Sequence, residues 1–243
     1  MELKRKTALV TGGAKRVGHE IALGLAKKGV NVLLHYNTSQ SEAQGTASKI
    51  KALGVDCLLF KADLAKRDDV AKLLKEISGQ PHGVDILVNN ASRFYKTSLE
   101  TVKESDWDEL MDINLKAPFL LSKEIGNKMA ASNGGKIINI ADWSGFRPYK
   151  NYLPYCTSKG GLITMTKALA RDLAPKVQAN AIAPGPVLLP PDFTEEEKEK
   201  AIKKTLLGHE GTPQDIANAV IFLAENDYIN GIVLTVDGGR SIN

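Results

Sequence analysis

The stretch Thr11-Gly12-Gly13-Ala14-Lys15-Arg16-Val17-Gly18 decides the fold. An apolar, β-branched run, Thr7–Thr11, precedes this glycine turn, and the segment Gly18–Lys28 after it has the periodicity of an amphipathic helix. Between a strand and a helix, glycines let the main chain approach a pyrophosphate, and the free N–H groups of the helix N-terminus bind it. We interpret the turn as a dinucleotide-binding loop; an ordinary strand-to-helix turn is the alternative.

Outward from this turn, short apolar runs alternate with helical segments along the chain. The predicted strands are Thr7–Thr11, Asn31–His35, Asp56–Lys61, Ile86–Asn89, Lys136–Ile140, Gln178–Ala183 and Ile232–Val236. The predicted helices are Gly18–Lys28, Ser41–Leu53, Val70–Ile77, Asp106–Met129, Tyr155–Leu173 and Pro213–Ala224. Most strands are continuous apolar runs, which is typical of parallel strands buried on both faces. The pattern predicts an α/β fold with a single Rossmann-type, doubly wound parallel sheet of about seven strands and helices on both faces.

No boundary interrupts this alternation, so we expect residues 1–243 to form a single dinucleotide-binding domain. The run Glu195–Lys204 interleaves acidic and basic residues, as a surface helix does. It follows a turn rich in proline (Pro184, Pro186, Pro190 and Pro191). We therefore predict a substrate flap over residues 185–210.

Composition narrows the class of protein. Of the 243 residues, 43% are hydrophobic and 25% charged, which is ordinary for a globular chain. The net charge is +4 and the densest basic run, Lys4-Arg5-Lys6, is short, so we expect no nucleic-acid partner. No apolar stretch has the length of a signal peptide or a membrane span, so we expect a cytoplasmic protein without a membrane partner. Cys57 and Cys156 have neither metal-ligand spacing nor a disulfide framework, and no metal is expected.

The end of the second predicted strand bears on the cofactor. The sequence His35-Tyr36-Asn37-Thr38-Ser39 contains no acidic residue. A carboxylate here usually binds the ribose hydroxyls of NAD and would repel the 2′-phosphate of NADP. Lys15 and Arg16 stand in the glycine turn, and a guanidinium can hold a phosphate with two hydrogen bonds. These residues predict NADP(H) rather than NAD(H), unless both basic side chains simply face solvent.

Tyr155 and Lys159 form the candidate catalytic pair. They stand four positions apart on a predicted helix, so their side chains share one face. A nearby ammonium stabilises a phenolate, and we expect it to lower the pKa of Tyr155 toward neutrality. Tyr155 would then act as a general acid for a carbonyl or imine that receives a hydride. Alone, this spacing would favour a simple pair on a helix surface.

Five landmarks together give the chain a resemblance to the short-chain dehydrogenase/reductase family over nearly its full length. They are the glycine turn, Asp63-Leu64, Asn89-Asn90-Ala91, the Tyr155/Lys159 pair and Pro184-Gly185, in that family's order. The resemblance implies that Lys159 also holds the nicotinamide ribose, that Asp63 and Leu64 contact the adenine, and that Asn114 orders a proton-relay water. It also implies a homotetramer. Further cofactor contacts are expected from Gly12, Lys15, Arg16, Val17, Gly18, His35, Tyr36, Asn37, Ser39, Asn90, Ala91, Ser92, Tyr155, Pro184, Gly185 and Val187.

Three departures from the general family pattern are similar to one subgroup, the pteridine reductases. Arg16 and Ser92 stand where the family usually has glycines, and Asp142 stands where it has a serine before the catalytic tyrosine. The run Asn89-Asn90-Ala91-Ser92-Arg93-Phe94-Tyr95 and the pair His35-Tyr36 also match that subgroup. The resemblance implies that Phe94 stacks on a pterin ring whose polar edge is surrounded by Arg16, Ser92, Asp142 and Tyr155. Leu188 is expected at the same site, and Asp142 would help Tyr155 supply a proton.

Three functions stay open at this point. The first is an NADPH-dependent reductase of dihydropterins, with dihydrofolate as a further candidate substrate. The second is a reductase of another carbonyl, such as a 3-oxoacyl thioester. The third is a non-catalytic NADP-binding sensor, which would not need the Tyr155/Lys159 pair. Phe94 as a core aromatic and Asp142 as a turn or cap residue are the structural alternatives, and Trp143 is open between lining the pocket and packing against the flap.

Overall fold

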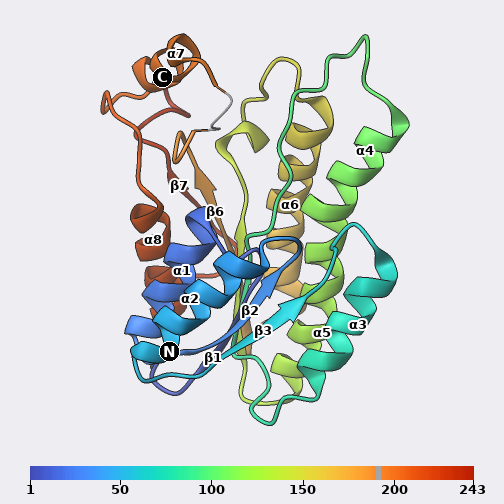
Figure 1. Ribbon diagram of the computed structural model, residues 1–243, viewed down its shortest axis with the longest axis vertical. Helices are drawn as coiled ribbons and strands as arrows, with labels where there is room; N and C mark the ends of the chain where they lie inside the picture. Colours follow the sequence, from blue (N-terminus) through green and yellow to red (C-terminus); the bar gives the residue numbers. More distant parts are fainter. Residues whose placement is uncertain (190–192) are drawn as a thin grey trace.

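A computed structural model describes residues 1–189 and 193–243 of the chain. Its strands form one parallel sheet in the order β3-β2-β1-β4-β5-β6-β7 (Figure 1). They are β1 Thr7–Val10, β2 Asn31–Tyr36, β3 Cys57–Lys61, β4 Ile86–Asn89, β5 Gly135–Ile140, β6 Val177–Pro184 and β7 Val233–Val236. The predicted Rossmann fold is confirmed, and each predicted strand agrees with the structure to within one residue at either end.

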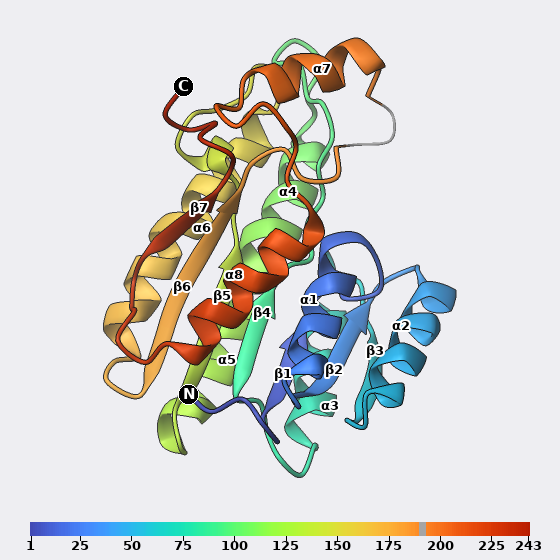
Figure 2. The ribbon, with the colours of Figure 1, turned by 90° about the vertical axis from the view of Figure 1, so that its left-hand side faces the viewer.

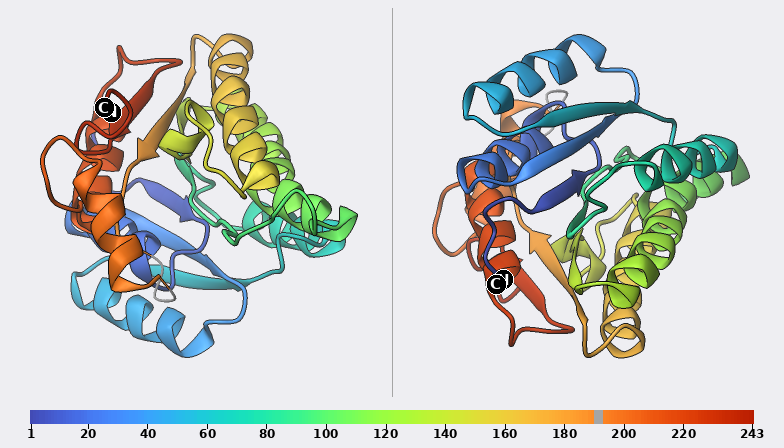
Figure 3. Two further views of the ribbon diagram at one scale, coloured as in Figure 1. Left: turned by 90° about the horizontal axis from the view of Figure 1, so that it is seen from above. Right: turned by 90° about the horizontal axis from the view of Figure 1, so that it is seen from below.

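Helices cover both faces of the sheet (Figure 3). One face carries α1 Arg16–Lys27, α2 Gln40–Ala52 and α8 Pro213–Glu225, and the other carries α3 Arg67–Ser78, α4 Glu104–Met111, α5 Ala117–Ala131 and α6 Leu153–Asp172. Strand side chains alternate between the two faces, so Val10 joins the apolar core beneath α1 and α8 while Leu9 joins the core beneath α3 and α5. None of the helices in the described ranges is long and apolar enough to cross a membrane.

The long helix predicted over Asp106–Met129 is divided in the structure. Helix α4 ends at Met111, a π-helical turn covers Asp112–Lys116, and α5 begins at Ala117. The uninterrupted helix was therefore a wrong prediction. A π-helical turn inserts an extra residue and changes the direction of the side chains it carries, here including the buried Asn114.

The strand order reverses between β1 and β4, and this reversal determines where a ligand can bind. Beyond the carboxyl ends of two strands whose connections run in opposite directions, an open crevice forms. The loops that follow β1, β4, β5 and β6 all end at this edge of the sheet (Figure 2). Helix α7, Glu195–Lys203, lies above the same edge (Figure 1).

Candidate active site

A cavity of about 770 Å³ occupies the carboxyl edge of the sheet. It brings together nearly all of the residues that the sequence singles out. Those residues are Gly12, Lys15, Arg16, Val17, Gly18, His35, Tyr36, Asn37, Ser39, Asp63, Leu64, Asn90, Ala91, Ser92, Phe94, Asp142, Tyr155, Lys159, Pro184, Gly185, Val187 and Leu188. Segments far apart in sequence therefore meet at one place, as the predicted site requires.

The glycine turn is built for close approach of a ligand to the main chain. Gly12 has φ +62°, a left-handed conformation that favours glycine. A Cβ on Gly18 would lie 2.1 Å from the carbonyl oxygen of Gly12, so this position has no room for a side chain. The N-cap residue of α1, Lys15, makes no side-chain capping hydrogen bond, and the first turn of the helix carries no acidic residue. The turn therefore leaves main-chain N–H groups and a positive helix end for an anionic diphosphate.

Two side chains form hydrogen bonds with the main chain of this turn. The Gly12 N–H donates to Nδ1 of His35 at 3.1 Å, and Nδ2 of Asn90 donates to the carbonyl of Thr11 at 2.9 Å. Burial lowers the pKa of His35 to about 4, so its ring is neutral near pH 7 and can accept from the turn. The other ring nitrogen lies 3.1 Å from the carbonyl oxygen of Ala62. Both nitrogens of His35 thus bond to the protein itself, and the ring acts as a support for the turn.

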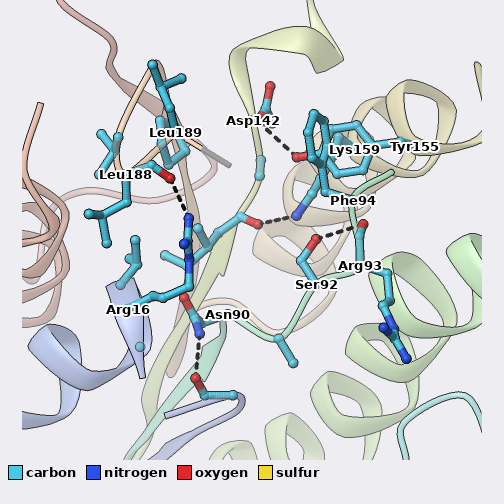
Figure 4. A pocket seen from close by; sticks show the side chains of 18 of the residues that line it. Arg16, Asn90, Ser92, Arg93, Phe94, Asp142, Tyr155, Lys159, Leu188 and Leu189 are labelled. Atoms are coloured by element: carbon cyan, nitrogen blue, oxygen red, sulfur yellow. Dashed lines mark hydrogen bonds between the residues drawn. The ribbon is translucent and has the colours of Figure 1, made fainter. Parts of the chain in front are cut away.

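Tyr155 and Asp142 form a hydrogen-bonded pair in the cavity wall (Figure 4). The Tyr155 hydroxyl donates to Oδ2 of Asp142 at 2.9 Å. The other carboxyl oxygen, Oδ1, accepts from the N–H of Ser144 at 2.7 Å and so caps the short 3₁₀ turn Trp143–Gly145. Asp142 follows β5 and Tyr155 lies in the first turn of α6. Asp142 is therefore a capping residue and a neighbour of the candidate acid at once.

The direction predicted for the pKa of Tyr155 is wrong in this structure. Burial, together with the charge and hydrogen bond of Asp142, raises the pKa of Tyr155 well above its ordinary value. Burial likewise raises the pKa of Asp142, and the charge of Lys159 opposes this effect. The Lys159 ammonium, 5.7 Å from the centroid of the Tyr155 ring, does not outweigh burial and the carboxylate. Burial therefore disfavours the charged forms of both Tyr155 and Asp142, and a phenolate is the less favoured form of Tyr155.

Lys159 lies beneath the pair, buried between α6 and β5. Its Nζ donates to the carbonyl of Ile140 at 2.9 Å and lies 5.7 Å from the centroid of the Tyr155 ring. Burial lowers the pKa of Lys159 to about 8, while the charge of Asp142 acts in the opposite direction. Lys159 is therefore positioned to compensate a negative charge on Asp142.

Asn114 supports the loop after β4 instead of lining the cavity. Its Oδ1 accepts from the Ser92 hydroxyl at 3.0 Å and from the N–H of Arg93 at 2.9 Å. Its Nδ2 donates to the carbonyl of Arg93 at 3.0 Å and to the Ser158 hydroxyl at 3.2 Å. The side chain predicted to order a water is thus fully engaged with protein groups, and it fixes Ser92 at the edge of the cavity.

An aromatic cluster stands over the catalytic pair. Phe94 stacks on Tyr152 with ring centroids 4.6 Å apart and meets Tyr155 edge to face at 4.8 Å. Its side chain lines the cavity and is 36% exposed, so Phe94 is not a core aromatic. Tyr149 and Tyr152 also line the cavity, and sequence reasoning missed both. Their spacing, with tyrosines at every third position up to Tyr155, was the available signal.

The far wall of the cavity comes from the loop after β6 and from α7. The Arg16 guanidinium donates to the main-chain carbonyl of Leu188, so these two predicted substrate residues touch each other. Trp143 lines the cavity, which is the first of its two alternatives, and packs edge to face on Tyr149 at 5.0 Å. Residues of α7 also line the cavity. Part of the predicted flap, residues 190–192, lies outside the described residues.

Comparison with known proteins assigns the family. A sequence profile of the short chain dehydrogenase family matches residues 6–201. The 3-oxoacyl-[acyl-carrier-protein] reductase FabG of Staphylococcus epidermidis is 36% identical over 239 residues, covering 96% of this chain and 98% of that relative. This chain belongs to the short-chain dehydrogenase/reductase family. As a member of that family it is an NAD(P)-dependent oxidoreductase of a small-molecule substrate.

Solved structures of similar sequence extend over the whole chain. FolM Alternative dihydrofolate reductase 1 from Brucella canis, complexed with NADP, superposes with a TM-score of 0.92 at 31% identity, covering 100% of this chain and 96% of that one. A blue fluorescent protein from a metagenomic library, in complex with NADPH, has a TM-score of 0.91 at 33% identity and covers 99% of this chain and 100% of that one. Both neighbours hold the phosphorylated form of the cofactor.

Proposed function

We propose that this short-chain dehydrogenase/reductase is an NADPH-dependent reductase of a dihydropterin, with dihydrofolate as a further candidate substrate. The observation that carries the proposal is the hydrogen bond from Tyr155 to Asp142 next to the partly exposed ring of Phe94, which meets the Tyr155 ring at 4.8 Å. A pterin is a flat heterocycle with a polar edge, so it needs an aromatic face on one side and donors and acceptors at its rim. Phe94 supplies the face, and Asp142, Tyr155, Ser92 and Arg16 supply the rim.

The proposed proton chemistry starts from a pair in which both Tyr155 and Asp142 carry a proton. Reduction of a ring C=N bond adds a hydride to carbon and a proton to nitrogen, and a bound reduced nicotinamide supplies the hydride. When substrate binds, the Tyr155 hydroxyl turns from Oδ2 of Asp142 to the ring nitrogen and gives it its proton. The carboxylic O–H of Asp142 then donates a proton to the Tyr155 oxygen, so the direction of the bond between the two side chains reverses. The negative charge then rests on Asp142, where the Ser144 N–H and the Lys159 charge stabilise it. Solvent protonates Asp142 again, so no free phenolate forms.

NADP(H) is the cofactor that this site supports best. The glycine turn fits a diphosphate, and Lys15 is an exposed cation within it. Asn37 and Ser39 line the cavity at the end of β2, where an acidic residue would repel a 2′-phosphate. The NADP-bound and NADPH-bound neighbours agree with this choice.

The second candidate is reduction of a 3-oxoacyl thioester. It is favoured by the 36% identity to the Staphylococcus epidermidis 3-oxoacyl-[acyl-carrier-protein] reductase over almost the full chain. Asp142 argues against it, because a carboxyl group stands where the family usually has a neutral serine hydroxyl. Fold and overall identity do not decide the substrate, since the same fold serves many.

The deciding experiment offers three substrates to the purified protein in parallel: dihydrobiopterin, dihydrofolate and an acetoacetyl thioester. Consumption of NADPH is followed by its absorbance, with NADH as the control cofactor. Turnover of a dihydropterin with preference for NADPH supports the roles given to Arg16, Phe94 and Asp142. If only the thioester is turned over, the family, the choice of cofactor and the role of the Tyr155/Lys159 pair are retained. Phe94 and Asp142 would then have structural roles only.

A Tyr155→Phe variant separates an enzyme from a cofactor-binding sensor. Loss of the hydroxyl removes the proton donor, so we expect kcat to fall by about 10²- to 10⁴-fold. The dissociation constant for NADPH, measured by fluorescence titration, is expected to stay within about threefold. A variant that turns over at the original rate would exclude Tyr155 as the acid.

We also propose that residues 1–243 act as one domain and assemble as a homotetramer, as the resemblance to the family implies. Sedimentation velocity on the purified chain measures the assembly directly. A monomer at micromolar concentration would exclude the tetramer.

A further inference from the structure

The aromatic cluster begins at the catalytic pair, and a cationic side chain lies at its other end. Arg240 follows β7, is half-buried and lines the same cavity. Its guanidinium carbon lies 4.7 Å from the centroid of the Trp143 ring, which supports it on one face. Arg240 is not among the residues that sequence reasoning selected.

No acidic side chain compensates this charge within the described ranges. Among those residues, Arg240 forms no ion pair and its guanidinium makes no hydrogen bond, although it has five N–H donors. Burial lowers the pKa of Arg240, the phenol of Tyr149 acts in the opposite direction, and the nearby charge of Arg147 lowers the pKa further. A guanidinium remains charged under these conditions, so an unneutralised cation faces the cavity.

Aromatic contacts connect this cation to the proton donor. Tyr155 meets Phe94 at 4.8 Å, Phe94 meets Tyr149 at 6.3 Å, and Tyr149 meets Trp143 at 5.0 Å. A continuous aromatic wall therefore runs from the reacting end of the cavity to Arg240. A flat ring held at Phe94 leaves this wall free for a substituent of the same substrate. Exposed lysines, Lys150 and Lys204, line the cavity as well and add positive charge.

We propose that Arg240 binds an anionic group carried by the substrate, a carboxylate or a phosphate on the substituent of the pterin ring. The proposal rests on the pterin reductase function above and deepens it, because it makes an anionic dihydropterin the preferred substrate. A planar guanidinium binds either group with two parallel hydrogen bonds, and the Trp143 ring, 4.7 Å from the guanidinium carbon, limits its movement. The negative substituent also gains from the positive charge of the lysines that line the same cavity.

The test compares wild type with Arg240→Gln and Arg240→Lys. Three substrates are used: dihydrobiopterin, which has a neutral side chain, dihydrofolate, which has carboxylates, and dihydroneopterin monophosphate. For Arg240→Gln we expect KM to rise about 10-fold for an anionic substrate, with kcat and the dihydrobiopterin KM within about twofold. Arg240→Lys keeps the charge and is expected to recover part of the loss. The two anionic substrates distinguish carboxylate from phosphate as the group recognised.

Arg171→Gln is the matched control, because Arg171 is an exposed arginine on α6 outside the cavity. It removes the same charge and is expected to leave all three KM values unchanged. Binding of folate to the NADP⁺-loaded protein, measured by calorimetry, gives a second readout that does not depend on turnover. Folate affinity is expected to fall about 10-fold in Arg240→Gln and to stay unchanged in Arg171→Gln.

Several results would overturn the assignment of Arg240. An equal rise in KM for neutral and anionic substrates would assign Arg240 a packing role, and weaker NADPH binding would assign it to the cofactor. The inference also fails if wild type has the same KM for neutral and anionic pterins and Arg240→Gln has no selective effect on either. The proposed function still stands in that case, because dihydropterins are reduced. If no dihydropterin is reduced, the proposed function fails and the inference fails with it.

Discussion

The bond between Tyr155 and Asp142 determines the pH dependence that we expect. Burial raises the pKa of Asp142, and the protonated carboxyl is the form that can resupply Tyr155. As the pH rises through this raised pKa, Asp142 ionises and kcat/KM for dihydropterin reduction falls. Asp142→Asn cannot supply a proton, so we expect its kcat to be about 10²-fold lower than that of wild type. The decrease of kcat/KM at high pH that we assign to Asp142 should be absent in this variant. Steady-state rates of both proteins, measured from acid to alkaline pH, test this prediction. If Asp142→Asn keeps the same decrease of kcat/KM at high pH, that decrease is due to another group.

His35 makes stability depend on pH in the acid range. Its folded pKa, about 4, lies below the ordinary 6.5 because burial disfavours the charged ring. The unfolded chain therefore binds a proton that the folded protein does not, and stability is lost as the pH falls below about 6.5. Between about pH 7.5 and about pH 5 we expect His35 to account for roughly 2 kcal/mol of lost unfolding free energy. Urea unfolding at both pH values tests this.

The control for this prediction is His35→Gln, which keeps a hydrogen-bonding side chain but cannot titrate. We expect it to be less stable than wild type near neutral pH and to lose much less stability on acidification. Equal losses in the two proteins would show that other groups cause the acid sensitivity.

At the scale of elements, the loop after β4 depends on its attachment to α4. The Tyr95 hydroxyl donates to Glu109 at 2.9 Å, and Arg93 forms an ion pair with the same carboxylate at 3.4 Å. Burial and the adjacent carboxylates raise the pKa of Tyr95, so its phenol stays protonated and remains a donor. These bonds hold the main chain on both sides of Phe94, which makes Tyr95 a positioning residue.

We expect Tyr95→Phe to raise KM for a dihydropterin by about three- to tenfold, because one hydrogen bond to a carboxylate is lost. The expected change in kcat is less than about twofold, and the NADPH dissociation constant should not move. Tyr228→Phe is the matched control, since Tyr228 is fully exposed at 102%. A fall in kcat without a change in KM would contradict a positioning role.

The elements themselves were predictable where one local signal dominates. Continuous apolar runs determined the strands, because a parallel strand buried on both faces needs no polar alternation. The same reasoning failed between Asp106 and Met129, where helical periodicity continues through the π-helical turn. Pro118, in the first turn of α5, was a usable sign of a new helix start within that segment.

From the sequence, the candidate site was predictable only for the residues that belong to a recognisable motif. Tyr155, Lys159 and Asp142 were found because they stand at fixed positions relative to a family pattern. Tyr152 and Arg240 were not found, because their places depend on how loops from separate parts of the chain pack together. The pKa of Tyr155 was misjudged for the same reason: sequence spacing indicates that an ammonium is near, but not that burial and a carboxylate outweigh it.

At the scale of the whole molecule, Lys136 connects the central sheet to the C-terminal part of the chain. It lies on β5 with 1% of its side chain exposed, and its ammonium donates to Oδ1 of Asp227 at 2.8 Å and to the carbonyl of Asn226. These partners follow α8, so the bond joins segments about ninety residues apart. The hydrogen bond from Lys136 is the main cause that lowers the pKa of Asp227 to about 2. A buried ammonium depends on such partners, because an uncompensated charge in the interior is costly.

Asp227→Asn is therefore expected to lower the free energy of unfolding by about 1–2 kcal/mol at neutral pH, less than for a fully buried pair because the carboxylate is largely exposed. In a Lys136→Met background the lysine ammonium is gone, while the N-terminal ammonium of Met1 still lies 2.8 Å from Oδ1 of Asp227. The same Asp227→Asn substitution should therefore cost less than in wild type, about 0.5–1 kcal/mol, and the difference is the coupling to Lys136. Urea unfolding of the four proteins gives the coupling between the two sites, with Asp56→Asn as a control at an exposed aspartate. Additive effects would mean that Lys136 is held by the main-chain carbonyl of Asn226 alone. Strand β5 and the segment before β7 would then be joined by that hydrogen bond and by packing, without a contribution from the Asp227 charge.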